Sequence, residues 1–261
     1  MEIVTDQCWI EITKNFGSTD NPKYFCILHA PKNEEPTCSK EWPIEKRGEQ
    51  QASFLLNLIN EWNETNLIRK ENSQLPISLT LVGVNSGSLV FPDKYIFTGD
   101  IVLARAEFKG KVSLKSAIFL ETAIFEETIF FEDAFFNKTE FHSGASFIHA
   151  QFGKSSEFSD AKFNNALFYA AKFGQGIKAD SRNEYQYLYS TKFDDAKFDG
   201  QAHFDFAEFA GDAIFARVSF GKTAEFTKSK FYQSALFSNA IFVSKAIFKK
   251  TEFFENVYFD Y

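Results

Sequence analysis

Three cysteines and one histidine near the N-terminus have the residue types and spacing of a metal site. Cys26 and His29 form a C-x2-H pair within "KYFCILHAPKNEEPTC", Cys38 follows His29 by nine residues, and Cys8 lies upstream. Thiolates and imidazoles at such spacing hold zinc in tetrahedral sites. The alternative is that these are small buried residues that fill an N-terminal head. The sequence therefore leaves two interpretations open, a structural zinc site or ordinary packing.

Outside this segment, the residue order does not indicate catalysis. We find no glycine-rich phosphate loop and no order of Ser, His and Asp that indicates a nucleophilic triad. His142, His149 and His203 lie in a repetitive region, and of these only His203 is predicted to point outward. Three cysteines are an odd number in a chain too long for a small disulfide scaffold. We expect a non-enzymatic protein.

A repeat in the sequence predicts the secondary-structure elements that would position such residues. The chain of 261 residues contains 34 Phe but only 9 Tyr and one Met, so one bulky residue fills the same kind of position many times. The repeat has 26 centres, of which 25 are Phe and 17 have Ala two residues before them. The centres are Phe108, Leu114, Phe119, Phe125, Phe130, Phe136, Phe141, Phe147, Phe152, Phe158, Phe163, Phe168, Phe173, Phe193, Phe198, Phe204, Phe209, Phe215, Phe220, Phe226, Phe231, Phe237, Phe242, Phe248, Phe253 and Phe259.

The spacing between centres alternates between five and six residues, which gives a period of 11. Eleven residues is also the repeat of a right-handed helical supercoil. On a helix, however, residues two apart lie about 200° apart, so each Ala would oppose its Phe. On a strand, residues two apart share one face and the residue between them points outward. The intervening residue is often Glu, Lys or Ser, which favours strands wound into a coil with Phe and Ala inside.

This pattern resembles the pentapeptide-repeat family over residues 91–261. The resemblance implies a right-handed, four-sided β-helix, in which two periods of 11 make one coil because every second unit has a sixth residue. Some bacterial members of that family open with a YC-x-x-H-x-P segment, which matches here at Phe25, Cys26, His29 and Pro31. Several members imitate duplex DNA and bind or protect type II topoisomerases, which gives an alternative function to weigh against a scaffold.

Two other segments belong to the predicted architecture. Residues 50–70, within a head of residues 1–90, have Leu55, Leu58, Ile59 and Trp62 at helical spacing, so we expect a helix that caps the β-helix. The repeat is interrupted at about residues 174–191, where Tyr185, Tyr187 and Tyr189 alternate with other residues. This interruption is either a degenerate coil with a bulging loop or a projecting recognition loop.

The outward position between Ala and Phe is often apolar near the C-terminus. With two periods in each coil, Ile214, Leu236 and Tyr258 should lie one above another. Contiguous exposed apolar area marks binding surfaces, although strand propensity on a half-covered face also explains it. We predict a rigid protein-interaction scaffold that binds an unknown protein partner, or a second copy of itself through the C-terminal coils. The predicted contact residues are Ile214, Leu236, Ile241, Ile247, Phe254 and Tyr258, together with Tyr185, Tyr187 and Tyr189.

Charge and hydropathy limit the partners and the location. The formal net charge is −7, without a basic cluster of the kind that binds nucleic acid, so we expect no direct nucleic-acid contact. The DNA-mimic alternative needs a dense acidic stripe, but outward lysines such as Lys162 and Lys197 interrupt the acidic residues. There is no signal-peptide pattern and no apolar run of membrane-spanning length. We expect a cytoplasmic protein without membrane contact.

Overall fold

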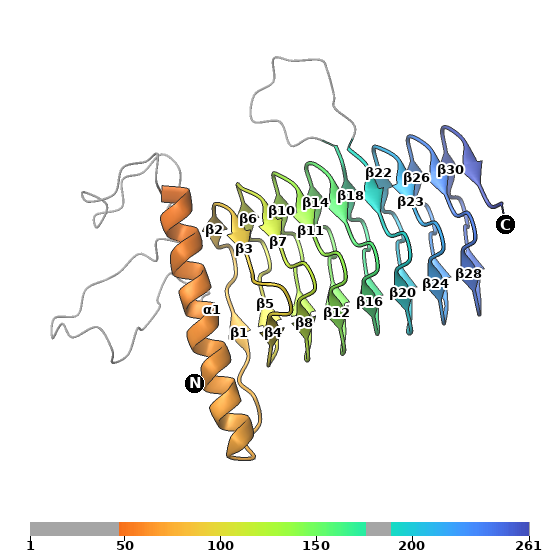
Figure 1. Ribbon diagram of the computed structural model, residues 1–261. Helices are drawn as coiled ribbons and strands as arrows, with labels where there is room; N and C mark the ends of the chain where they lie inside the picture. Colours follow the sequence, from red (N-terminus) through yellow and green to blue (C-terminus); the bar gives the residue numbers. More distant parts are fainter. Residues whose placement is uncertain (1–46, 176–188, 261) are drawn as a thin grey trace, which may run out of the picture.

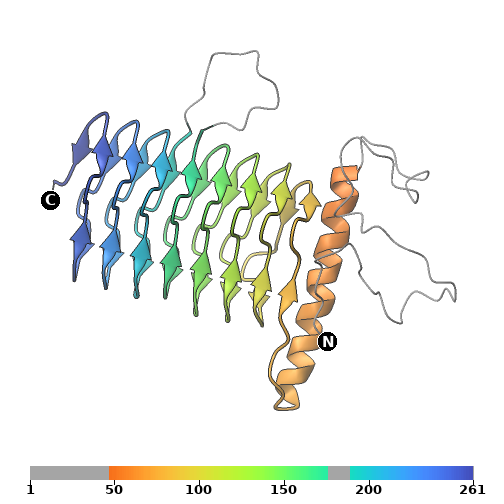
Figure 2. The ribbon, with the colours of Figure 1, turned by 180° about the vertical axis from the view of Figure 1, so that it is seen from behind.

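The repeat region forms a four-sided parallel β-helix. The computed structural model describes residues 47–175 and 189–260. Within them, short strands stack in four parallel sheets of eight, eight, eight and seven strands (Figure 1). Each strand pairs with the equivalent strand of the neighbouring coils, as Figure 2 shows from the opposite side. The predicted fold class is confirmed.

The four sheets, named A to D in the order in which the chain enters them, contain strands of two residues each. Sheet A contains β1 (Leu79–Thr80), β5 (Ile101–Val102), β9 (Ala123–Ile124), β13 (Ala145–Ser146), β17 (Ala166–Leu167), β21 (Ala202–His203), β25 (Ala224–Glu225) and β29 (Ala246–Ile247). Sheet B contains β2 (Asn85–Ser86), β6 (Glu107–Phe108), β10 (Ile129–Phe130), β14 (Gln151–Phe152), β18 (Lys172–Phe173), β22 (Glu208–Phe209), β26 (Lys230–Phe231) and β30 (Glu252–Phe253). Sheet C contains β3 (Leu89–Val90), β7 (Val112–Ser113), β11 (Ala134–Phe135), β15 (Ser156–Glu157), β19 (Thr191–Lys192), β23 (Ala213–Ile214), β27 (Ala235–Leu236) and β31 (Val257–Tyr258). Sheet D contains β4 (Ile96–Phe97), β8 (Ile118–Phe119), β12 (Glu140–Phe141), β16 (Lys162–Phe163), β20 (Lys197–Phe198), β24 (Ser219–Phe220) and β28 (Ile241–Phe242).

The β-helix begins earlier than the Phe pattern suggests. Leu79 pairs with Ile101, and Leu89 pairs with Val112, so residues before 91 already belong to the first coil. Leucine and valine fill the inward positions there. Sequence reasoning missed this coil because it followed Phe rather than the inward position itself.

Aromatic rings stacked along the axis form the core. Every repeat centre from Phe108 to Phe237 is at most 2% exposed. The ring of Phe215 lies parallel to that of Phe193, with centroids 4.9 Å apart, which is the spacing of neighbouring strands. Around one coil the rings meet edge to face, as Phe204 and Phe215 do at 5.5 Å. Both arrangements are favoured aromatic geometries, which explains why one residue type recurs.

Thr and Ser also occupy some of the small inward positions, because a backbone carbonyl accepts the hydrogen bond of the buried hydroxyl. Thr128 stands where most units have Ala, and its buried Oγ1 donates to the carbonyl of Leu103 at 2.8 Å. Ser229 does the same toward Phe204 at 2.6 Å. A buried hydroxyl with a partner avoids the cost of an unsatisfied group, so Thr and Ser can replace Ala there.

Alternate corners of the coil have different turns, which accounts for the five-and-six spacing. In the five-residue units a four-residue turn closes with a hydrogen bond, as from the N–H of Thr128 to the carbonyl of Phe125 at 3.3 Å. Its third residue has a positive φ, 56° at Glu127, as a type II turn requires. The equivalent residues are Lys94, Arg105, Ser116, Lys138, His149, Asp160, Ala170, Asp195, Phe206, Arg217, Lys228, Asn239 and Lys250. The six-residue units turn through wider bends, where the extra residue lies.

The predicted capping helix is confirmed as α1 (Arg47–Glu71), which lies across the N-terminal end of the β-helix (Figure 1). Leu55, Ile59 and Trp62 are buried against the first coil, and Leu58 is half-buried. The helix therefore covers the apolar end that the first coil would otherwise expose.

Amide side chains of α1 also pair with the edge of the first coil. Asn66 accepts from the N–H of Ile77 at 2.8 Å and donates to its carbonyl at 3.0 Å. Asn63 accepts from the N–H of Thr98 at 3.0 Å and donates to the carbonyl of Ile96. Each amide thus takes the place of a neighbouring strand, so these edge groups are not open to further pairing.

Candidate interaction surfaces

The C-terminal end of the β-helix exposes its apolar core. Phe237 is 1% exposed, whereas Phe259, one coil further along the same column, is 49% exposed. Phe242, Phe248 and Phe253 are half-buried, so the exclusion of solvent from the repeat centres ends in the last coil. The strands at this end, β28 to β31, are the terminal strands of their sheets. In the described residues this end carries no counterpart of α1.

An apolar column leads along sheet C to this open end. Ile214 pairs with Leu236, and Leu236 pairs with Tyr258, so the predicted alignment of these three residues is confirmed. Phe254 lies at the corner between sheets B and C, where its ring stacks on that of Tyr232 with centroids 5.1 Å apart. The side chain of Phe254 is 56% exposed. The column and the corner together form an apolar strip that ends at the open coil.

The remaining predicted contact residues lie on other sides. Ile241 belongs to sheet D, where it follows Ser219, and Ile247 belongs to sheet A, where it follows Glu225. Ile241 is 57% exposed, and its near neighbour Val243 is exposed as well. The predicted residues therefore do not make one face. They surround the open end on three sides, because successive units of one coil point in different directions.

The interruption of the repeat lies at one corner, between β18 and β19. Lys172 keeps its pairing with Gln151 and Glu208, and Thr191 keeps its pairing with Ser156 and Ala213. Strands of the regular register therefore stand on both sides of the insertion, and residues 176–188, on which the two interpretations of the interruption differ, lie outside the described residues.

Glycines allow the two ends of the insertion to meet. The N–H of Tyr189 donates to the carbonyl of Gly174 at 3.2 Å. A Cβ on Gly174 would lie 2.0 Å from the carbonyl oxygen of Tyr189, and one on Gly211 would lie 2.4 Å from it. Tyr189 is half-buried at this base, while Tyr185 and Tyr187 lie outside the described residues. The predicted role of these tyrosines in recognition stays a prediction.

The proposed zinc ligands Cys8, Cys26, His29 and Cys38 also lie outside the described residues. That site stays a prediction from the sequence.

A comparison with known families agrees with the coil geometry. A family model described as pentapeptide repeats (9 copies) matches residues 95–140, which include strands β4 to β11. This match and the four-sided coil of the described residues fit a pentapeptide-repeat protein. No curated protein matches the sequence. Among the described residues, no helix is long and apolar enough to cross a membrane.

Outward charges alternate in sign along part of sheet B. Along sheet B, Lys172, Glu208, Lys230 and Glu252 follow one another in register. Beside them, the corner between sheets A and B has a groove of about 490 Å³. Its lining residues are His149, Ala170, Lys172, Phe206, Glu208, Lys228, Lys230, Lys250 and Glu252. Because lysines and glutamates share the groove, it offers a mixed surface rather than a field of one sign. Sequence reasoning missed it, since residues of successive coils become neighbours only when the chain winds.

Ion pairs between coils hold some of these charges in place. Lys162 donates to Glu140 at 2.7 Å, and His142 lies 3.1 Å from the same carboxylate. The hydrogen bond from Lys162 is the main reason why the pKa of Glu140 is below its ordinary value. Arg217 likewise donates to Asp195 at 2.6 and 2.8 Å, and this lowers the pKa of Asp195. These pairs are largely exposed, so solvent screens them and they contribute little to stability.

Proposed function

We propose that this pentapeptide-repeat protein is a non-enzymatic, rigid scaffold that binds protein through its apolar C-terminal end. The observation that carries the proposal is the contrast between Phe237 and Phe259, which are 1% and 49% exposed at equivalent positions. The repeat normally buries this position fully. A partner that covers the last coil would complete the burial of its rings and exclude water from them.

A second copy of the same chain fits this end. The edges of β28 to β31 have backbone groups available for pairing, and exposed strand edges favour contact with other chains. A two-fold axis across the rod would place the same coil of two copies face to face, so that each apolar residue meets an equivalent surface. The occupant we propose is therefore a second copy, joined end to end.

Light scattering on paired variants tests this proposal. Ile241→Asp combined with Phe254→Asp places two charges on exposed positions of the last coil. The expected result is a change from dimer to monomer with an unchanged circular dichroism spectrum. The matched control is Val90→Asp, which changes an outward residue that is 51% exposed at the opposite end of sheet C. The control should stay dimeric.

Two results would contradict the homodimer. One is a wild-type protein that is monomeric at high concentration, and the other is a dimer that the double variant leaves intact. If a different protein binds the wild type and loses affinity for the double variant only, the scaffold function holds and the identity of the occupant changes.

The alternative function, DNA mimicry directed at a type II topoisomerase, has less support. A mimic of a polyanion needs a continuous acidic face. The alternation of Lys172, Glu208, Lys230 and Glu252 along sheet B breaks such a face. We therefore favour the scaffold over the mimic.

A further inference from the structure

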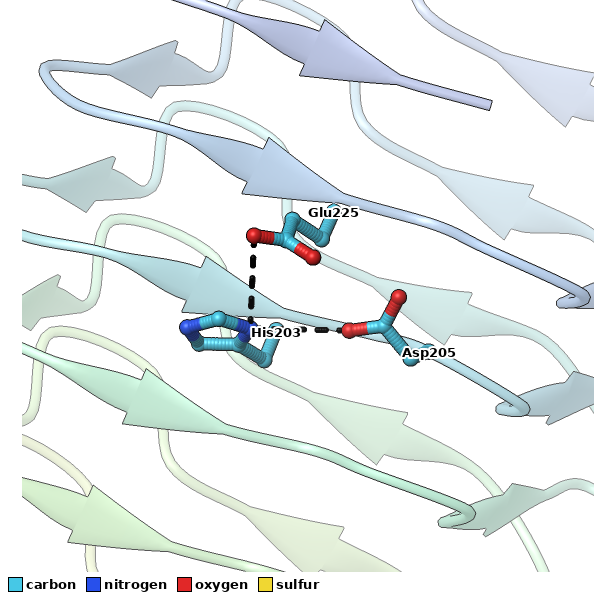
Figure 3. Close-up of side chains that lie close together, drawn as sticks. All are labelled: His203, Asp205 and Glu225. Atoms are coloured by element: carbon cyan, nitrogen blue, oxygen red, sulfur yellow. Dashed lines mark ion pairs between the residues drawn. The ribbon is translucent and has the colours of Figure 1, made fainter. Parts of the chain in front are cut away.

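Three potential metal ligands of two adjacent coils converge on the surface of sheet A. His203 is the outward residue of β21, Glu225 is the outward residue directly after it in β25, and Asp205 lies in the turn that follows β21 (Figure 3). His203 Nδ1 lies 3.5 Å from Asp205 Oδ2 and 4.0 Å from Glu225 Oε1. Asp205 is buried, and the other two residues are half-buried.

Neighbouring groups orient these side chains. The N–H of Thr227 donates to Asp205 Oδ1 at 3.1 Å, which leaves Oδ2 facing the imidazole. Gln201 places its amide oxygen 3.4 Å from His203 Nε2. An amide oxygen accepts only, so this contact is compatible with the tautomer that has its proton on Nε2 and a lone pair for a metal on Nδ1. In that tautomer, Nδ1 and one oxygen of each carboxylate offer three lone pairs within 4.8 Å of one another.

Within the described residues, this cluster lacks the lysine that accompanies the pair of His142 and Glu140. At the other histidine–carboxylate pair, between His142 and Glu140, the ammonium group of Lys162 lies 2.7 Å from the carboxylate. In the described part of the chain, neither Asp205 nor Glu225 forms an ion pair with a lysine or arginine. Two carboxylates that face an imidazole lone pair repel one another unless a positive charge lies between them.

We propose that His203, Asp205 and Glu225 bind a divalent transition-metal ion of the Zn²⁺ class. Zinc holds imidazole nitrogen and carboxylate oxygen at about 2.0–2.2 Å, so tetrahedral ligand atoms lie roughly 3.3–3.6 Å apart. The distance of 3.5 Å between His203 and Asp205 meets this requirement. Glu225 Oε1 lies 4.0 Å from His203 Nδ1, and the three ligand atoms lie within 4.8 Å of one another, so the outward side chain of Glu225 has to move inward to complete the tetrahedral arrangement.

The donor set selects the ion. A nitrogen ligand beside two carboxylates suits zinc and its neighbours, whereas Mg²⁺ and Ca²⁺ prefer oxygen ligands alone. Three protein ligands leave a fourth position of a tetrahedral ion, which water or a group from a partner can fill. The bound ion would also link two adjacent coils.

Zinc binding to the full chain tests the proposal, in a background of Cys8→Ser, Cys26→Ser and Cys38→Ser. This background removes the separate thiol site predicted at the N-terminus. Isothermal titration with Zn²⁺ should give one equivalent bound, and binding should raise the melting temperature. Glu225→Gln, which keeps the size of the side chain, should weaken the affinity at least tenfold. His203→Leu should do the same, and leucine already occupies this outward position one coil earlier, at Leu167.

The matched control is His142→Ala, which removes the histidine of the cluster that already has Lys162, and it should leave zinc affinity unchanged. An equal excess of Mg²⁺ should not displace the ion. Absence of zinc binding in the cysteine-free background would overturn the proposal. Equal affinity in the parent and both site variants, with their folds confirmed by circular dichroism, would overturn it as well.

Discussion

Replacement of Phe215 by alanine should lower the free energy of unfolding by about 3–5 kcal/mol. Phe215 is fully buried, and its ring stacks on Phe193 at 4.9 Å and on Phe237 at 5.0 Å. It also meets the edges of Phe204 and Phe226 at 5.5 and 5.6 Å. Alanine would therefore interrupt one aromatic column and leave a cavity bounded by rings on every side.

The magnitude follows from the area involved. A buried aromatic side chain removes about 150–250 Å² from water, and apolar burial contributes roughly 25 cal/mol per Å², which gives about 4–6 kcal/mol for the whole side chain. The Cβ of alanine keeps part of this burial free energy. The cavity adds a cost, because the neighbouring rings are fixed by the strand spacing and cannot collapse into the cavity. The two effects oppose each other and bring the expectation to the stated range.

Phe259→Ala is the matched control, since it changes the same column one coil beyond Phe237 but at a side chain that is 49% exposed. It should cost about 1 kcal/mol or less, because little area is lost and no enclosed cavity forms. Urea denaturation followed by circular dichroism measures the total effect. Hydrogen exchange resolved by peptide measures where it acts, since each coil of a solenoid contacts only its neighbours.

In Phe215→Ala, amides between residues 193 and 237 should lose protection, whereas those near Phe108 should keep it. A loss of stability below about 1 kcal/mol, or equal losses in Phe215→Ala and Phe259→Ala, would refute the account of a stacked and continuous core.

Three further predictions concern the cap, the insertion and the charged faces. Asn66→Ala should cost about 1–3 kcal/mol in urea melts, because an edge donor and acceptor lose their partner, and an unchanged midpoint would contradict this. Gly174→Ala should cost more than about 2 kcal/mol by calorimetry, since its Cβ would lie 2.0 Å from a carbonyl oxygen at a φ of +70°, whereas the control Gly144→Ala meets nothing nearer than 3.9 Å. The bond from Lys162 lowers the pKa of Glu140, so its stabilisation is present above the ordinary value of 4.5 and is lost as the pH falls through the lowered value in the folded protein. Across this acidic range, the free energy of unfolding should therefore fall less for Glu140→Gln than for the wild type, by less than about 1 kcal/mol. Parallel pH curves for the two proteins would exclude the effect.

The sequence determined the interior of the repeat because burial there depends on local spacing. An Ala two residues before a Phe, such as Ala123 before Phe125, puts both on one face of an extended segment wherever the segment lies. Two periods of the repeat per coil then imply which residues stack, and Ile214, Leu236 and Tyr258 do so. Helical spacing in residues 50–70 predicted α1 for the same reason.

Only the tertiary structure decided where outward residues of different units lie relative to one another. Ile241, Ile247 and Phe254 follow each other closely in sequence but point from different sides, because the chain turns a corner after each unit. Conversely, His203 and Glu225 are two periods apart in the sequence and become neighbours only through the register of sheet A.

The ends and the insertion were also decided in three dimensions. Asn63 and Asn66 replace a missing strand only because α1 lies across the first coil, which no pattern within the helix specifies. Gly174 and Gly211 are needed because the carbonyl of Tyr189, at the base of the insertion, approaches both of them closely. Inward residues obey a rule of spacing along the chain, whereas a surface site depends on the winding of the whole coil.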